Sequence, residues 1–206
     1  MSEASKIVIA THNEDKVKEI ISILGSDDRF EFISGVGDID WDEPEEVGTT
    51  LEENATIKAK TASKSTGMVA IADDTGLEVD ALDGLPGVHS SRYAGDDATY
   101  EDNYRKLLGV MVEIPLIERS ARFRTVVSCV SGNDNLFVVE GVLNGYITDE
   151  PLGEHGFGYD PVFLIPHLQR TLAQLKPDEK NAISHRYLAF RKALKKLVSL
   201  YKEGLL

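Results

Sequence analysis

The stretch MVAIADDTGLEVDALDGLPGVHSSRYAG, from Met68 to Gly95, is the part of the sequence around which the rest of the chain is interpreted. Its first four residues are an apolar run typical of a buried strand, and this predicted strand ends in two adjacent carboxylates, Asp73 and Asp74. Strand ends are where open α/β sheets bind ligands. Two carboxylates followed by Thr75 suit Mg²⁺, which prefers oxygen ligands. The alternative interpretation is an acidic turn in which an aspartate caps the next element.

Length and charge limit the classes of function. A chain of 206 residues can bury a substantial core, and we expect a single domain over residues 1–206. The formal net charge of −13 argues against binding a nucleic-acid polymer, which requires a basic face, but not against binding a nucleotide. No apolar run approaches the ~20 residues that a transmembrane helix needs. Cys129 is the sole cysteine, so no internal disulfide can form, and we expect a cytoplasmic protein.

A second candidate site lies near the start of the chain. Residues 6–10 (KIVIA) predict a strand, and an apolar periodicity that ends at Gly25 predicts a helix. Between them stands Thr11–Lys16 (THNEDK), at the helix N-terminus, where backbone N–H groups and the helix dipole attract anions. Asn13 and Lys16 would add donors and a positive charge for a phosphate. In the alternative interpretation Asn13 caps the helix and Lys16 is solvated.

The next helix is well marked by its sequence. Thr50 and Glu53 predict a capping box at its start. Asn54 and Lys58 are four residues apart and therefore share one face, from which a second lysine could reach the same phosphate. The acidic run that precedes this helix, residues 42–46 (DEPEE), is typical of a solvated loop.

The second half of the chain predicts more strands and a glycine-rich loop. Residues 121–130 alternate like a strand, and residues 136–147 predict one or two strands broken at Asn144-Gly145. In the loop over residues 153–166, Gly156-Phe157-Gly158 places an aromatic ring between glycines, where it could stack on a nucleotide base.

The last helix begins near Ser184, a candidate N-cap, and Lys180, His185 and Arg186 gather at its start. Cations at a helix N-terminus oppose the helix dipole, and this cost favours a role in binding a ligand.

Seven short motifs are spread over nearly the whole chain: THNEDK (Thr11–Lys16), ENATIKA (Glu53–Ala59), ADDTGL (Ala72–Leu77), GLPGVHS (Gly84–Ser90), SRYAG (Ser91–Gly95), GFGYDP (Gly156–Pro161) and KNAISHR (Lys180–Arg186). In this order they resemble the inosine triphosphate pyrophosphatase family, whose members hydrolyse nonstandard purine nucleoside triphosphates. The resemblance implies an α/β fold in which an elongated mixed β-sheet with flanking helices forms two lobes around a nucleotide-binding cleft. It also implies Mg²⁺ dependence, a homodimer, and hydrolysis of ITP, dITP and XTP to the monophosphate and pyrophosphate.

The resemblance also implies roles for individual residues. Asp74 would be the catalytic carboxylate that binds metal and activates water, and Thr75 stands where the family usually has a serine. The metal ligands would be Asp74, Asp73 and an acidic residue before the second helix, either Glu45 or Glu46, of which we take Glu45. The residues expected to bind substrate are Thr11, His12, Asn13, Glu14, Asp15, Lys16, Lys58, Thr75, Phe157, Gly158, Tyr159, Asp160, Lys180, His185 and Arg186.

Two other functions compete with this one. Asp74-Thr75-Gly76 also spells the Asp-Thr-Gly triplet of aspartic proteases, but a protease dyad needs two such triplets and this chain has one, so only a dimer could supply both. A regulator that binds nucleotides without hydrolysing them is the second alternative, and the pair Asp73-Asp74 argues against it.

Overall fold

The computed structural model describes residues 4–34, 36, 39, 41, 42 and 44–206. Its strands are β1 (Ser5–Ile9), β2 (Phe30–Ser34), β3 (Val69–Val79), β4 (Pro86–Gly87), β5 (Ser120–Ser131), β6 (Asp134–Ile147), β7 (Phe163–Ile165) and β8 (Arg170–Thr171). Its α-helices are α1 (Glu14–Leu24), α2 (Leu51–Thr66), α3 (Tyr100–Val110), α4 (Pro177–Asn181) and α5 (His185–Lys202). Glu43, from the acidic run, lies outside the described residues.

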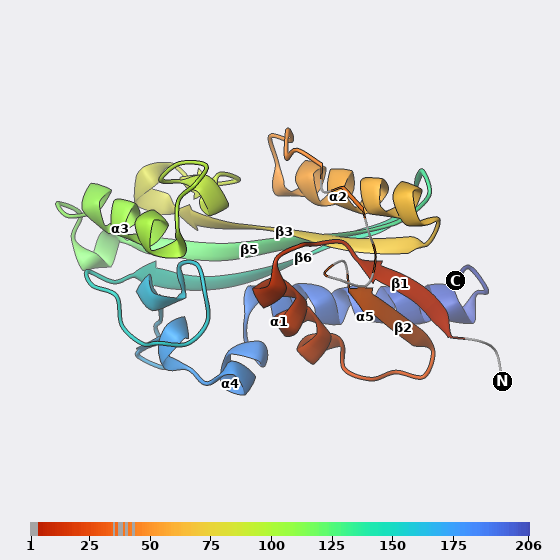
Figure 1. Ribbon diagram of the computed structural model, residues 1–206. Coiled ribbons are helices and arrows are strands. Elements are labelled where there is room, and N and C mark those ends of the chain that lie inside the picture. Colours follow the sequence, from red (N-terminus) through yellow and green to blue (C-terminus); the bar gives the residue numbers. More distant parts are fainter. Residues whose placement is uncertain (1–3, 35, 37–38, 40, 43) are drawn as a thin grey trace. The chain divides into compact units, whose positions relative to one another are not determined.

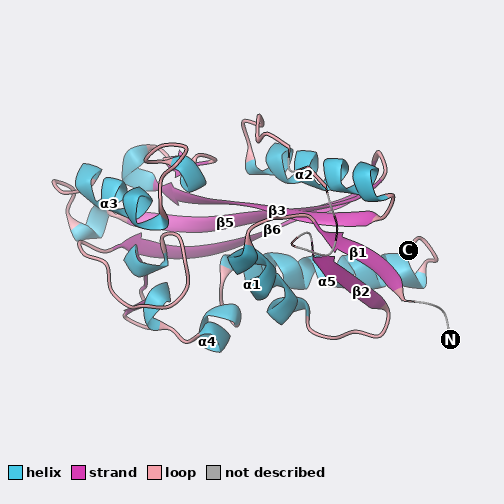
Figure 2. Cartoon of the chain, viewed as in Figure 1, coloured by secondary structure: helices cyan, strands magenta, loops and turns pink. Residues whose placement is uncertain are grey.

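The strands form one mixed sheet, as expected for the α/β class. Among the described residues the order is β2-β1-β3-β5-β6-β7-β8, and β4 pairs with β3. Figure 2 labels β1, β2, β3, β5 and β6 of this sheet. Strand β1 is parallel to β2 and β3, whereas β7 is antiparallel to β6 and β8. None of the helices in the described part of the chain is long and apolar enough to cross a membrane.

The chain forms two compact units, each built from separate segments. Unit 1 contains residues 1–74, 125–141 and 186–206, and unit 2 contains residues 75–124 and 142–185. The single domain, the elongation and the cleft expected from the sequence stay predictions.

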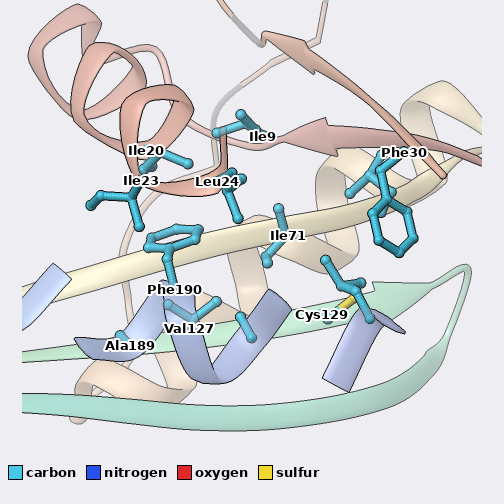
Figure 3. Close-up of a cluster of buried hydrophobic side chains, with 13 residues drawn as sticks. Ile9, Ile20, Ile23, Leu24, Phe30, Ile71, Val127, Cys129, Ala189 and Phe190 are labelled. Atoms are coloured by element: carbon cyan, nitrogen blue, oxygen red, sulfur yellow. The ribbon is translucent and has the colours of Figure 1, made fainter. Parts of the chain in front are cut away.

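The core of unit 1 has two faces because side chains alternate along its strands. Ile7 and Ile9 of β1 pack with α1 and α5, in the cluster that Figure 3 shows around Phe190. Val8, from the opposite face of β1, packs instead with the alanines of α2. Helix α2 therefore covers one face of these strands, and α1 and α5 cover the other (Figure 1). The small alanine side chains let α2 approach closely, and this helix carries Lys58.

Unit 2 has its own apolar core. Phe163 of β7 and Phe123 of β5 are buried in it with ring centroids 4.6 Å apart, and Leu107 and Met111 join them from the C-terminal part of α3 and the residue after it. This core supports the loop between β6 and β7, which contains Phe157.

The predicted end of β3 is wrong. The strand does not stop before the carboxylates but continues through Asp73 and Asp74 to Val79. Every residue of β3 except Val69, Thr75 and Glu78 is buried, and the late part of the strand pairs with β4, so the backbone stays extended. The two carboxylates therefore point from the middle of a strand rather than from a flexible turn.

The predicted break at Asn144-Gly145 is also wrong, because β6 runs without interruption from Asp134 to Ile147. Gly145 is explained by packing instead: a Cβ there would lie 2.5 Å from the carbonyl oxygen of Leu164 and 2.6 Å from the ring of Phe163. Only glycine lets β7 approach this closely. The Asn-Gly dipeptide, which often forms a hairpin turn, is explained in this strand by the close contact with β7.

Candidate active site

Asp74 is the centre of a buried polar cluster in unit 1. It is 5% exposed, and each of its carboxylate oxygens accepts a hydrogen bond from α2. Lys58 Nζ donates to Oδ1 at 3.0 Å, and Asn54 Nδ2 donates to Oδ2 at 3.3 Å. The two donors are one helical turn apart and share the face that the sequence predicted.

Lys58 joins Asp74 to a second carboxylate. Its Nζ donates to Glu46 Oε1 at 2.8 Å, and its side chain is 2% exposed. Burial alone would lower the pKa of Lys58, but the carboxylates of Asp74 and Glu46 outweigh burial and raise the pKa, so the ammonium stays charged. Burial raises the pKa of Asp74, and the positive charges of Lys58 and Lys16 oppose that rise.

A second charged group in unit 1 surrounds Asp73, whose side chain is fully buried. Lys16 Nζ lies 3.5 Å from Asp73 Oδ2, and Arg186 Nη2 donates to the same oxygen at 3.3 Å. Arg186 Nη1 in turn donates to Glu19 Oε2 at 2.5 Å. Arg186 is 1% exposed and thus buried between two carboxylates. Burial lowers the pKa of Lys16, an effect that Asp73 opposes.

The turn before α1 has features of both interpretations, the helix cap and the phosphate site. Asn13 caps the helix as the structural interpretation expected: its Oδ1 accepts from the backbone N–H groups of Asp15 and Lys16. Two of the donors that an anion could use are thus occupied. Lys16, however, is not solvated, because its side chain is 17% exposed and lies against Asp73. A phosphate bound at this turn would therefore be attracted mainly by the positive charge of Lys16, rather than by the backbone N–H groups.

The other residues of the turn differ in exposure. Thr11 is buried and its Oγ1 accepts from the backbone N–H of Asn13. His12 is exposed and stacks on Trp41, with ring centroids 4.7 Å apart. Glu14 pairs with Lys18 at the surface. These contacts bring none of the three into the Asp74 cluster.

The donor set around Lys58 fits Mg²⁺. This ion is usually held by one or two carboxylates, with waters and substrate phosphates completing its shell. Asp74 and Glu46 converge on one ammonium, whereas no group of three or more acidic, histidine or cysteine side chains in the described residues could hold a metal by itself. Glu45 is exposed, so the structure favours Glu46 for this role. Asp73 is engaged by Lys16 and Arg186 and fits the role of a metal ligand less well.

The same contacts argue against an aspartic protease. A protease dyad holds two carboxyl groups together so that they share a proton. The Asp-Thr-Gly aspartate of this chain instead accepts from a lysine and an amide. The one thiol offers no nucleophile either, because burial raises the pKa of Cys129 to about 12.

A separate cluster in unit 2 shapes the glycine-rich loop. Asp160 is 2% exposed, and its Oδ2 accepts from the backbone N–H of Phe157 at 2.9 Å and from Lys180 Nζ. A Cβ at Gly156 would lie 2.0 Å from that oxygen, so only glycine fits beside it. Lys180 Nζ also lies 4.8 Å from the centre of the half-buried Phe157 ring, a cation–π contact. Lys180 and Asp160 therefore hold the loop together.

Two further residues that were expected to bind the substrate are instead buried inside unit 2. The hydroxyl of Tyr159, a residue that is 4% exposed, donates to the carbonyl of Ser90 at 2.9 Å. His185 is 2% exposed, and its ring stacks on that of Phe123 with centroids 4.4 Å apart. Both residues support the loop and helix around them. Within the GFGYDP motif, Gly156 is exposed and Phe157 and Gly158 are half-buried, as is Thr75.

Three residues of the charged clusters in unit 1 were missed by the sequence analysis or were named in it only as an alternative. Asn54 was noted only for sharing a face with Lys58, and Glu46 was the less favoured alternative to Glu45. Glu19 was not noted, although it follows Lys16 by three residues on α1, a spacing that places both on one helix face. That spacing is the signal that could have found it.

Comparison with known proteins gives consistent matches over nearly the full chain. The family model described as the Ham1 family matches residues 7–196. A dITP/XTP pyrophosphatase of Elusimicrobium minutum is 48% identical over 93% of this chain and 99% of the relative, and one of Bacillus licheniformis is 48% identical over 97% and 99%. Among solved structures, a HAM1 protein from Coxiella burnetii is similar with a TM-score of 0.86 and 40% identity, covering 95% of this chain and 99% of that one. The Ham1 protein of Staphylococcus aureus is similar with a TM-score of 0.81 and 38% identity, over 95% and 99%.

Proposed function

Because this chain belongs to the Ham1 family, we propose that it hydrolyses nonstandard purine nucleoside triphosphates, among them dITP, ITP and XTP, to the monophosphate and pyrophosphate. The names of its relatives supply the substrate class. The single structural observation that supports the proposal is the buried Lys58 ammonium held by Asp74 and Glu46. This arrangement combines a base for water with a positive charge for a phosphate.

Unit 1 supplies the charges that a triphosphate needs. Lys16 and Lys58 are both largely buried, and each is paired with a carboxylate. Charges in such surroundings are screened less by water than surface charges, so they act more strongly on a bound anion. The carboxylate partners keep both ammonium groups in place before the substrate binds, which lowers the ordering cost of binding.

The proposed reaction is attack of water on the α-phosphorus. Asp74 orients the water and accepts its proton as the oxygen–phosphorus bond forms. The bond between the α-phosphorus and the bridging oxygen breaks, and pyrophosphate leaves with that oxygen. Lys58 and Lys16 stabilise the negative charge that develops on the phosphates. Rate enhancement in this scheme comes from positioning and electrostatic stabilisation.

We further propose that Mg²⁺ takes part, with Asp74 and Glu46 as its protein ligands. When bound, the ion would neutralise phosphate charge and polarise the attacked phosphorus. Asp73 is left out of this set, because its contacts with Lys16 and Arg186 suit a role in placing those cations.

We assign recognition of the purine base to the glycine-rich loop, as the resemblance to the family implies. The Phe157 ring offers a stacking surface, and backbone N–H groups near Gly158 could donate to the 6-oxo group that inosine and xanthosine share. Adenine presents a donor at that position, which would leave buried donors unpaired. A homodimer and a cytoplasmic location are further proposals, which rest on the resemblance to the family and on the sole cysteine.

The products test the proposed function. We expect a panel of nucleoside triphosphates, with pyrophosphate and orthophosphate measured separately, to show pyrophosphate from ITP, dITP and XTP and little reaction with ATP. Orthophosphate as the first product would place the attack at the γ-phosphorus and refute the assignment. Binding of ITP without either product would support a regulator instead.

The role of Lys16 gives a second expected result. Lys16→Ala should raise the KM for ITP about tenfold or more with a smaller effect on kcat, because a hydrogen bond to a charged group contributes about 1.5–3 kcal/mol. Lys18→Ala is the matched control, since Lys18 is on the same helix with a side chain 71% exposed. An unchanged KM in the Lys16 variant would remove this residue from the triphosphate site.

A further inference from the structure

We propose that Asn54 is a positioning residue that orients the Asp74 carboxylate and fixes the loop that carries Glu46. The inference rests on the proposed function for its kinetic consequences, and on the contacts of Asn54 for its structural ones. Asn54 lies within unit 1 on α2, one turn before Lys58, and is 0% exposed.

The orientation of the Asn54 amide follows from its neighbours. Its Oδ1 accepts from the backbone N–H of Gly48 at 2.8 Å, and a backbone N–H can only donate. The amide oxygen must therefore face Gly48, which turns Nδ2 toward Asp74 Oδ2 at 3.3 Å. A carboxylate at this position could accept from Gly48 equally well but could not donate to Asp74.

Two donors on different oxygens determine the plane of the Asp74 carboxylate. Lys58 alone, bound to Oδ1, would leave the group free to rotate about its Cβ–Cγ bond. Asn54 removes that freedom by holding Oδ2. A carboxylate that must direct a water at phosphorus depends on this orientation, because misplaced catalytic groups lose much of their effect.

Asn54 also ties down the chain just after Glu46. A Cβ at Gly48 would lie 2.5 Å from Asn54 Oδ1 and 2.8 Å from Glu53 Cβ. The loop thus approaches α2 so closely that only glycine fits, and its backbone is bonded to the amide. Glu46, two residues earlier, reaches Lys58 from this anchored loop. One amide side chain therefore connects both carboxylates of the cluster.

The kinetic test uses two substitutions. Asn54→Ala removes both hydrogen bonds, whereas Asn54→Asp keeps an acceptor for Gly48 but replaces the donor to Asp74 by a second carboxylate oxygen. We expect each to lower kcat about 10- to 100-fold, the usual cost of losing a residue that orients a ligand or catalytic group. The KM for ITP should stay within about twofold, since Lys16 and Lys58 are retained.

Asn103 of unit 2 provides a matched control. It is also a buried asparagine, 2% exposed, whose Oδ1 accepts from the backbone of Ala94 and whose Nδ2 donates to the carbonyl of Ser91. Asn103→Ala should lower the melting temperature about as much as Asn54→Ala but leave kcat unchanged. A merely structural Asn54 would behave in the same way as Asn103.

A double-mutant cycle with Gly48→Ala tests the coupling. This change should also lower kcat, because the new methyl group displaces the amide. Combined with Asn54→Ala it should cost less than the product of the two single effects, since both act through the same contact. If the two effects on kcat multiply, Gly48 acts independently of Asn54, which would contradict the proposal that Asn54 anchors the loop through Gly48.

The outcomes separate this inference from the proposed function. Wild-type protein that releases no pyrophosphate refutes the function, whereas active wild type with wild-type kcat in both Asn54 variants refutes the inference alone. A crystal structure of Asn54→Ala decides the structural part in either case. A rotated Asp74 carboxylate or a shifted loop at residues 46–48 would support the inference, and unchanged positions would overturn it.

Discussion

Asp74→Asn is expected to fold like the wild type and to lose on the order of 10²-fold or more in turnover of ITP, the scale of losing a general base. The amide cannot accept a proton from water and binds a cation weakly. Folding should survive because Lys58 keeps its second carboxylate, Glu46, so that its buried ammonium is not left unpaired. Pyrophosphate release measures the turnover, and circular dichroism measures the fold.

Asp80→Asn is the control for this change. Asp80 also pairs with a cation, Arg122 Nη1 at 3.0 Å, but its side chain is 51% exposed, and turnover should stay at the wild-type level. If Asp74→Asn unfolds the protein, the carboxylate is mainly structural. If it folds and turns over normally, the base must be another group.

Arg186→Met should have the largest effect on stability. The substitution leaves Glu19 and Asp73 without the guanidinium buried between them, and breaking a buried ion pair in this way costs about 3–5 kcal/mol. Lys16 remains beside Asp73 and compensates only in part. Urea unfolding measures the loss. Arg122→Met is the matched control, since that side chain is 40% exposed and its pairs should contribute at most about 1 kcal/mol.

Arg186 is among the residues expected from the sequence to bind substrate, and the same variant tests whether it contacts the purine base. Because both ends of its guanidinium contact carboxylates, we expect the variant to slow ITP and ATP by equal factors, so that the preference for ITP persists. Arg186→Lys keeps the charge and gives a milder variant if the methionine form does not fold. A preference that falls toward unity in either variant would show that Arg186 contacts the base after all.

The local elements could be predicted from the sequence because their signals are local. Strand β1, Ser5–Ile9, lies within one residue of the predicted strand at residues 6–10, and α2 begins with the capping box of Thr50 and Glu53. A capping box joins groups three residues apart, and an apolar periodicity shows one buried face within a few turns. The motifs that indicated the family are local in the same sense.

What the sequence could not supply was the choice of partner for each charged side chain. Glu45 and Glu46 are equivalent as sequence, and only the path of the loop places Glu46 on Lys58. Arg186 and Glu19 are 167 positions apart, and Arg186 and Asp73 are 113 apart. Neither pairing leaves a periodic signal in the sequence.

The two errors in the strands have the same cause. Asp73 and Asp74 look like the end of a strand, and Asn144-Gly145 looks like a turn, when only neighbouring residues are considered. Burial by α2, α5 and the adjacent strands keeps β3 extended through its carboxylates, and the approach of β7 requires a glycine within β6. Local preferences of about 1 kcal/mol are outweighed by such long-range packing. The sequence alone therefore determined which chemical groups the site contains, and the tertiary structure decided which of them are held together, because that depends on burial and pairing across the sheet.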